Sequence, residues 1–416
     1  MLGKLSRCFI TSILFFLTTA HFSFSQNDHG MIYGQVKLKN GDSYKGQLRF
    51  EDDVAIWADM FEGVKSEGTL PENLSLEDIK PRASSDNDDS FQFGFMNLWE
   101  NRGKDLNPSF KCYFGYLERI KPLGDNLAHI KLKNGQWLKV KKNAESIFGK
   151  NRKILVYTIN GRKEFGWGEI KEIQLMPTPS GFKNYLGAPI YAEVFTTNGF
   201  FEGYLAWDNE ERLGTDEING KWGNKSSGHK LKDIESIKAV ENGSEITLRS
   251  GQKMKLTDHA DVTDKNAGIY LYNLTYGTIK VRWKQFISMQ ITKPAHPLPS
   301  YYDFKMPKHL YGWIETKDNS QYKGRILYDL DEKFDVEMVD GRENELDFFI
   351  PFNFITSIEP QNHNYSLVRL NNNVKKLLGI HDDITHNNHG ILIWNDDEEN
   401  QVLFVPFKLI KKISFK

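Results

Sequence analysis

Three stretches of the chain alternate apolar and polar residues on both sides of a short turn. They cover residues 32–50, 190–208 and 310–329, with turns at Asn40-Gly41, Asn198-Gly199 and Asp318-Asn319. A period of two places every second side chain on one face, so each stretch predicts a β-hairpin with one buried face. A glycine follows each hairpin at the same distance, at Gly63, Gly220 and Gly341. The hairpins therefore divide the chain into three similar segments.

Each segment has a second half, which opens with another alternating stretch at residues 129–135, 245–251 or 367–372. All six half-modules close with bulky apolar residues spaced three apart, at Phe114/Leu117/Ile120, Trp167/Ile170/Ile173, Leu231/Ile234/Ile237, Trp283/Phe286/Met289, Phe352/Ile355/Ile358 and Phe407/Ile410/Ile413. This spacing matches neither a strand nor a long helix. It predicts a strand end, a single 3₁₀ turn and a short final strand. Six occurrences at matching places make chance a poor explanation.

The predicted order of elements is a hairpin, one or two further strands, a 3₁₀ turn and a final strand. Small five-stranded SH3-like and Sm-like β-barrels have this order, and the half-modules resemble them. The residues that match the first Sm motif are Gly41, Gly46, Leu48, Asp52 and Asp53. The asparagine with which Sm proteins hold a base is absent, because Ile56 and Trp57 occupy that region. The resemblance implies an all-β fold of tandem five-stranded barrels, six half-modules in three pairs, and it does not carry RNA binding with it.

The expected domain organisation follows from these boundaries. Residues 1–25 have Lys4 and Arg7 before an apolar run and predict a cleaved signal peptide, too short in its apolar part for a membrane span. Barrel pairs are then expected at 26–185, 186–303 and 304–416. The first pair contains a long polar insert at 64–110, expected to be a loosely held flap, within which residues 91–96 predict a returning strand.

Charge and cysteine content narrow the class of protein. The chain has a net charge of −1, and loss of Lys4 and Arg7 with the signal makes it slightly more acidic. Nucleic-acid binders usually carry a basic excess, so no nucleic-acid partner is expected. Cys112 is the only cysteine after residue 25, which excludes an internal disulfide, and it is expected to be a packing residue. No transmembrane segment is expected once the signal is removed.

One polar pattern occurs twice and is the best candidate for chemistry. Its form is His-x-Asp-[Val/Ile]-Thr-x-x-Asn-x-Gly, beginning at His259 and at His381. The candidate metal ligands are His259 and Asp261 in one copy and His381, Asp383, His386 and His389 in the other. The alternative is turn chemistry, in which Asp, Thr and Asn bind backbone groups and Gly supplies a positive φ. Turn chemistry explains four of the residues together and is the favoured interpretation.

Two further sets of residues are candidates for binding. An acidic run could bind calcium, but it lacks EF-hand spacing and is expected to be a solvated face; it consists of Asp329, Asp331, Glu332, Asp335, Glu337 and Asp340. Four tryptophans in or near predicted loops could grip a sugar or a peptide, or pack on a neighbouring barrel: Trp57, Trp99, Trp222 and Trp394.

The expected function is that of a non-catalytic binding or scaffold protein, exported to the periplasm or secreted. The chain has no Gly-x-Ser-x-Gly, His-Glu-x-x-His, Walker or Gly-x-Gly-x-x-Gly motif, so neither an enzyme nor a cofactor is expected. The expected partner is a protein or an envelope polysaccharide such as peptidoglycan, by analogy with exported SH3-like domains. The alternatives are a metal-dependent protein or enzyme that uses the His-x-Asp segments, and a purely structural spacer.

Overall fold

The computed structural model describes residues 30–51, 53–71, 74–75, 78–81, 96, 99–100, 108–396 and 402–416. These residues form an all-β fold with sheets of ten, nineteen and two strands, and none of the sheets closes on itself within the described ranges. Every strand pair is antiparallel except one, between β4 and β30. The expected signal peptide at 1–25 lies outside the described residues.

In the first segment the strands form two units, and one is inserted into the other. The flanking unit consists of β1 (Tyr33–Leu38), β2 (Ser43–Phe50), β9 (Lys153–Thr158), β10 (Gly161–Gly166) and β11 (Ile170–Leu175), paired in the order β10-β9-β2-β1-β11. The central unit consists of β3 (Met60–Lys65), β5 (Ser109–Tyr113), β6 (Leu117–Pro122), β7 (Leu127–Leu132) and β8 (Trp137–Lys141), paired in the order β6-β7-β8-β3-β5. Strand β11 pairs with β6 and joins the two units.

In the second segment the flanking strands pair in the same order, whereas the first two strands of the central unit form the separate two-stranded sheet. Its flanking unit consists of β12 (Tyr191–Thr196), β13 (Gly199–Ala206), β19 (Ile269–Asn273), β20 (Gly277–Val281) and β21 (Phe286–Ile291). Its central unit consists of β14 (Glu217–Trp222), β15 (Lys225–Lys230), β16 (Ile234–Val240), β17 (Gly243–Leu248) and β18 (Lys253–Leu256). The units are joined through β21 and β16.

The third segment follows the same scheme. Its flanking unit consists of β22 (Tyr311–Thr316), β23 (Gln321–Leu327), β29 (Ile391–Asn395), β30 (Val402–Val405) and β31 (Ile410–Phe415). Its central unit consists of β24 (Met338–Glu343), β25 (Leu346–Pro351), β26 (Ile355–Pro360), β27 (Tyr365–Leu370) and β28 (Lys375–Gly379). Here β31 and β26 join the two units.

This interleaving differs from the consecutive half-modules that the sequence predicts. The hairpin β12–β13 is not extended by the strands that follow it in the chain, but by β19 and β21 from the end of the segment. Alternation of apolar and polar residues determines which face of a strand is buried, but it does not select the neighbouring strand. The pattern therefore located the strands without revealing their partners.

The prediction of a 3₁₀ turn before each closing strand is confirmed in all six places. The turns are η3 (Phe114–Tyr116), η4 (Trp167–Glu169), η5 (Leu231–Asp233), η7 (Trp283–Gln285), η8 (Phe352–Phe354) and η10 (Phe407–Leu409). Each begins at the first residue of an apolar triplet, and the next strand begins at the second. All eighteen triplet residues are buried except Trp283, which is half-buried. The spacing of three is thus a burial pattern.

The glycine after each hairpin is explained by close approach of two strands in the central unit. A Cβ on Gly220 would lie 2.8 Å from the Leu256 Cβ, and one on Gly341 would lie 2.7 Å from the Leu378 Cβ. Real Cβ atoms do not come so close, so a side chain at either position would push the strands apart.

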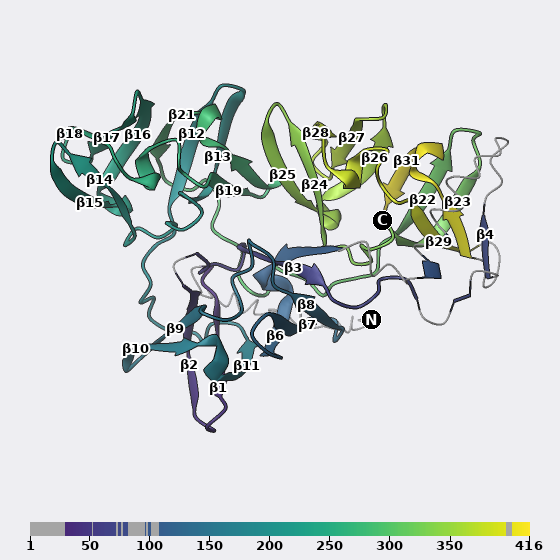
Figure 1. The fold of residues 1–416 in the computed structure, drawn as a ribbon, viewed down its shortest axis with the longest axis horizontal. Helices are drawn as coiled ribbons and strands as arrows, with labels where there is room; N and C mark the ends of the chain where they lie inside the picture. Colours follow the sequence, from purple (N-terminus) through teal and green to yellow (C-terminus); the bar gives the residue numbers. More distant parts are fainter. Residues whose placement is uncertain are drawn as a thin grey trace, which may run out of the picture.

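The second and third segments lie side by side along the top of Figure 1, and the first segment lies beneath them. Strand β20 of the second segment pairs with β25 of the third, with Ile279 opposite Phe348, so one sheet continues across both. In the first segment, the insert reaches across to the third: β4 (Ile79–Pro81) pairs with β30. The expected strand at 91–96 lies outside the described residues apart from Met96.

The proline-containing stretch 293–299 leads into residues that pack on the first segment. Tyr301 and Phe304 are buried in the same apolar core as Trp57 and Tyr113. Gly115 leaves room for the Phe304 ring, because a Cβ there would lie 2.1 Å from two ring atoms. The connection between the second and third segments therefore also binds the first.

Candidate functional site

The two His-x-Asp segments form short 3₁₀ turns, η6 (Ala260–Val262) and η9 (Asp382–Ile384). Asp261 Oδ2 accepts the backbone N–H of Asn219 on β14 at 2.6 Å, and Asp383 Oδ2 accepts that of Asp340 on β24 at 2.7 Å. Both aspartates therefore tie the turn to the neighbouring strand of the central unit.

The remaining residues of the pattern also bind backbone groups. Asn266 and Asn388 accept the N–H of the glycine two residues later, at 3.0 and 2.9 Å. Both glycines, Gly268 and Gly390, have positive φ values of 127° and 95°. These contacts agree with the turn chemistry favoured from the sequence.

The structure does not bring the four histidine candidates to one point. His259 Nδ1 lies 2.8 Å from Asp261 Oδ1 within its own turn. In the third segment, His381 Nε2 lies 3.8 Å from Asp347, and the His386 ring contacts His363 with centroids 4.3 Å apart. Of these four histidines, only His389 contacts the acidic run of residues 329–340, with Nδ1 2.9 Å from Asp329 Oδ1.

Of the four candidate tryptophans, only Trp222 is largely exposed, at 52%. Trp57 is fully buried against the Tyr301 ring, and Trp99 is buried with the residues around β30. Trp394 is half-buried under the Arg325 guanidinium, whose Cζ lies 4.1 Å from the ring centroid. Trp57 and Trp99 thus pack between parts of the chain.

A tight turn follows the second strand of each flanking unit, and we call these the acidic turns. They comprise residues 50–54, 207–211 and 328–332, and in each an isolated bridge joins the first residue to the fifth. Glu51, Asp208 and Asp329 occupy the second position with positive φ values of 50°, 51° and 48°. The fifth position is Val54, Glu211 or Glu332. The turns therefore share this bridge and the positive φ of the second residue, and they differ in the residue at the fifth position.

The acidic run of the third segment is buried, so the expectation of a solvated face is wrong for most of it. Around the third acidic turn lie six carboxylates, which we call the acidic cluster: Asp329, Asp331, Glu332, Glu337, Asp340 and Asp383. Glu332 is 4% exposed and Glu337 is 1% exposed. Asp335, the remaining member of the run, lies outside the cluster and accepts the Lys308 N–H.

Two lysines of the first segment reach into the acidic cluster. Lys65 Nζ lies 2.5 Å from Glu337 Oε2 and 3.8 Å from Asp331 Oδ2, and it donates to the Asp331 carbonyl oxygen at 2.6 Å. Lys111 forms an ion pair with Asp340. Both lysines are at positions that sequence reasoning missed, because each reads as an ordinary polar residue of an alternating strand, β3 or β5.

The acidic cluster still has more carboxylates than cationic groups, despite these two lysines. Burial lowers the pKa of Lys65, but Glu337 and Asp331 outweigh this effect and raise it above its usual value. Burial, with Asp331 next to it, raises the pKa of Glu332 well above its ordinary value. Burial also raises the pKa of Asp331 to about 6. Glu332 Oε2 and Asp331 Oδ1 are buried without a hydrogen-bond partner among the described residues.

The second segment has a smaller group of carboxylates at the matching place. Burial and the nearby Asp261 and Asp208 raise the pKa of Glu211 to about 9. Burial raises that of Asp208 to about 6, although the Ala267 N–H donates to its carboxylate. The Oε2 atom of Glu211 is buried without a hydrogen-bond partner in the described part of the chain.

A separate cleft of about 420 Å³ opens where the three segments meet. Its walls include Tyr116 of the first segment, Thr275 of the second and Asn353 of the third. Asn353 Nδ2 donates to the Tyr116 hydroxyl at 2.7 Å, while its Oδ1 is buried with no partner in the described ranges. A second hollow of about 210 Å³ shares Leu274 and Thr275 with the cleft and is lined by three tyrosines, Tyr191, Tyr204 and Tyr272.

Comparison of the chain with protein-family models, curated proteins and solved structures gave no significant match. Across the described ranges, no helix has the length and apolar character needed to cross a membrane. Cys112 is fully buried, as expected of a packing residue, and burial raises the pKa of its thiol well above the usual value.

Proposed function

We propose that this protein is an exported, non-catalytic binding scaffold whose three segments together hold an envelope polysaccharide in the cleft between them. The observation that carries the proposal is the composition of that cleft. Three asparagines, one tyrosine, four charged side chains and a few apolar groups line it, and they come from all three segments. Sites with a few directed polar groups on an apolar wall are typical of ligand binding.

The lining residues suit a sugar because amides both donate and accept hydrogen bonds, as sugar hydroxyls do. Asn371 and Asn372 are exposed on the rim, and Asn353 lies deeper. The aliphatic Leu274 and Met306, which are 49% and 64% exposed, provide an apolar surface against which a sugar ring can lie.

Contacts between the segments support this proposal, because a cleft lined by three segments keeps its shape only when the segments are held in place. Arg49 binds both carboxylate oxygens of Asp216 at 2.8 and 2.9 Å, joining the first and second segments. The Tyr113 hydroxyl lies 3.1 Å from Thr278 Oγ1. Asn372 Nδ2 donates to the Thr275 carbonyl oxygen at 3.1 Å and joins the third segment to the second.

The proposal includes a fold-level interpretation. Within each flanking unit the last strand, after its 3₁₀ turn, pairs with the first strand of the hairpin, as in the pairing of β21 with β12. This order of strand pairing favours the interpretation that the units are related to small SH3-like or Sm-like barrels. The contacts of Asp261 and Asp383 with backbone groups favour a structural role for the His-x-Asp segments over a catalytic one.

Cosedimentation of the chain, without residues 1–25, with insoluble peptidoglycan and other envelope polysaccharides tests the proposal. Asn371→Ala should reduce the bound fraction several-fold. Asn224→Ala is the matched control because Asn224 is an exposed asparagine in the loop between β14 and β15, and it should bind as the parent does. Failure to bind any polysaccharide, or equal binding by both variants, would contradict this function.

A further inference from the structure

The acidic cluster of the third segment holds more negative charge than its neighbours balance. Three of its six carboxylates have a nearby cationic or imidazole partner: Glu337 has Lys65, Asp340 has Lys111 and Asp329 has His389. Asp331 has only the more distant Lys65, at 3.8 Å. A buried carboxylate without a partner is costly, so the remaining charge requires either protons or a cation.

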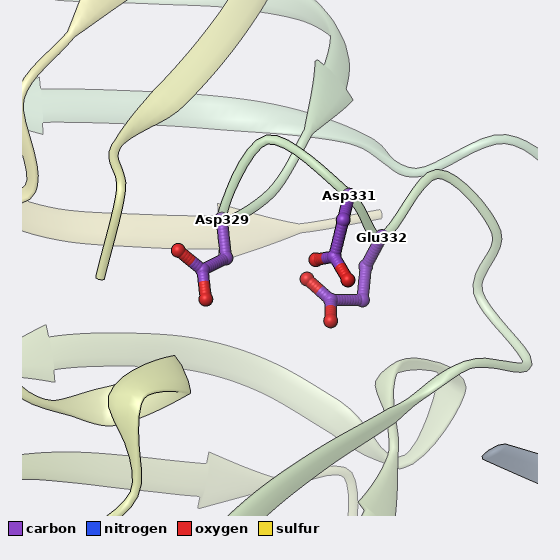
Figure 2. Close-up of side chains that lie close together, drawn as sticks. All are labelled: Asp329, Asp331 and Glu332. Atoms are coloured by element: carbon purple, nitrogen blue, oxygen red, sulfur yellow. The ribbon is translucent and has the colours of Figure 1, made fainter. Parts of the chain in front are cut away.

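Glu332 is the group that points to a cation most directly. It is more than nine-tenths buried, and its Oε2 accepts no hydrogen bond from the described residues. Figure 2 shows the Glu332 and Asp331 carboxylates facing each other, with Asp329 beside them on the same side of the turn. Asp331 Oδ1 is likewise buried without a partner. Apart from Lys65, the two carboxylates therefore have only each other in one buried space.

The spacing of these three side chains matches the first shell of a calcium ion. One ligand oxygen from each of Asp329, Asp331 and Glu332 lies within 4.8 Å of the other two. Because Ca²⁺ binds oxygens at roughly 2.3–2.6 Å, ligands on opposite sides of the ion are separated by about 5 Å or less. All three ligands are carboxylates, which favours a hard cation over zinc or copper.

Comparison of the acidic turns supports the same conclusion. Val54 and Glu332 occupy the same position of equivalent turns, and each is 4% exposed. An apolar side chain therefore suits this position, and a carboxylate is unfavourable there unless something binds it. In the first segment the turn contains no such buried carboxylate at its fifth position.

We propose that Asp329, Asp331 and Glu332 form a binding site for one calcium ion, which holds the acidic turn of the third segment against β3 of the first. The Asp331 carbonyl oxygen already accepts Lys65 Nζ, so the three carboxylates provide the ligands. Its binding neutralises the carboxylates that Lys65 and Lys111 leave unbalanced. This site is distinct from the cleft and does not depend on the proposed polysaccharide binding.

Isothermal titration calorimetry with CaCl₂ on chelator-treated chain, with thermal unfolding in parallel, tests the site. One ion should bind with a dissociation constant on the order of 0.1–1 mM, as in extracellular calcium modules. The melting temperature should rise by at least about 2 °C at 10 mM Ca²⁺. An equal concentration of MgCl₂ should give a smaller shift, because Mg²⁺ is smaller and loses its water reluctantly.

Glu332→Gln should abolish calcium binding while keeping the shape of the side chain, and Asp329→Asn provides a second variant. Without calcium, Glu332→Gln should melt no lower than the parent, because it removes an unpaired buried charge. Glu211→Gln is the matched control on the equivalent turn of the second segment and should still bind. The absence of calcium-dependent heat and melting shift in the parent would overturn the proposal. So would equal shifts with Mg²⁺ and Ca²⁺, or loss of binding in Glu211→Gln but not in Glu332→Gln.

Discussion

The first and third acidic turns share a bridge and a positive φ at their second residue, but their carboxylates meet different partners. In the first, Glu51 and Asp53 meet the Arg152 guanidinium at 2.5 and 3.4 Å, and the buried fifth position is Val54. In the third, Glu332 takes the place of Val54, and the turn receives Lys65 and the Thr69 hydroxyl from the first segment. The first turn therefore finds its cation within its own segment, whereas the third turn draws on another segment. A shared shape does not imply a shared role.

The largest expected effect comes from placing the buried glutamate of the third turn at the matching position of the first. Val54→Glu would bury a carboxylate beside Asp53, whose partner Arg152 already pairs with Glu51. We expect the free energy of unfolding to fall by about 3–5 kcal/mol, as when a buried charge loses its partner. Urea unfolding of the full chain measures this. Val54→Ala is the control, and a loss no greater for Glu than for Ala would show that the turns are not equivalent.

The next prediction tests whether the closing triplets mark the apolar core. Ile234, the central residue of a closing triplet, is fully buried, and Glu235 next to it is half-exposed. Ile234→Ala should leave a cavity and reduce the free energy of unfolding by about 2–5 kcal/mol. Glu235→Ala should change it by no more than about 0.5 kcal/mol. Equal losses in urea unfolding would mean that the triplets do not mark the core.

A third prediction uses Glu211 in the second turn, whose pKa rises to about 9 on folding. Asp261, Asp208 and Glu210 face it, and His259 pairs with Asp261. The folded state keeps this proton at pH values where the unfolded state has lost it. Stability therefore falls as pH rises from about 4.5 to 9, by at most about 1.4 kcal/mol per pH unit.

Glu211→Gln removes this pH dependence. Because Glu211 is only partly buried, we expect the variant to exceed the parent by about 1–3 kcal/mol at pH 8 and to match it near pH 5. Urea unfolding at several pH values gives the two curves. Parallel curves would mean that Glu211 is ionised in the folded chain at neutral pH.

The smallest effect is expected at Arg152, whose side chain is 26% exposed beside Glu51. Arg152→Met should cost about 1 kcal/mol or less, because water screens exposed ion pairs. The loss should shrink further in 1 M NaCl. A loss above about 3 kcal/mol in thermal or urea unfolding would indicate that the first turn depends on its cation as strongly as we infer for the third.

Much of the fold could be predicted from the sequence, because burial leaves a local pattern. The triplet at Leu231, Ile234 and Ile237 predicted a turn and a strand, and both are present as η5 and β16. The recurring position of Gly220 is visible in the sequence, whereas its close approach to Leu256 on β18 is visible only in the structure. The pairing of β13 with β19 could not be predicted in this way, because nothing within either strand specifies a partner some sixty residues away.

The candidate sites were less predictable for a similar reason. Asp329, Asp331 and Glu332 are adjacent in sequence and were identified as an acidic group, but their burial depends on β3 and β4 of the first segment. Lys65 carries no local signal that it will pair with Glu337, more than two hundred residues later. Adjacent residues reveal the chemistry of a site, and only the packing of distant segments reveals its environment.

The interleaved order of the strands also has a consequence for the time course of folding. When the hairpin β1–β2 has been synthesised, its partners β9 and β11 are still about a hundred residues away along the chain. The central unit, which lies between them, can pair its own strands first. The hairpin must meanwhile keep two unpaired edges exposed, and such edges are the places where chains aggregate. Folding of each flanking unit should therefore be the slow step, with the central unit formed before the last three strands join the first two.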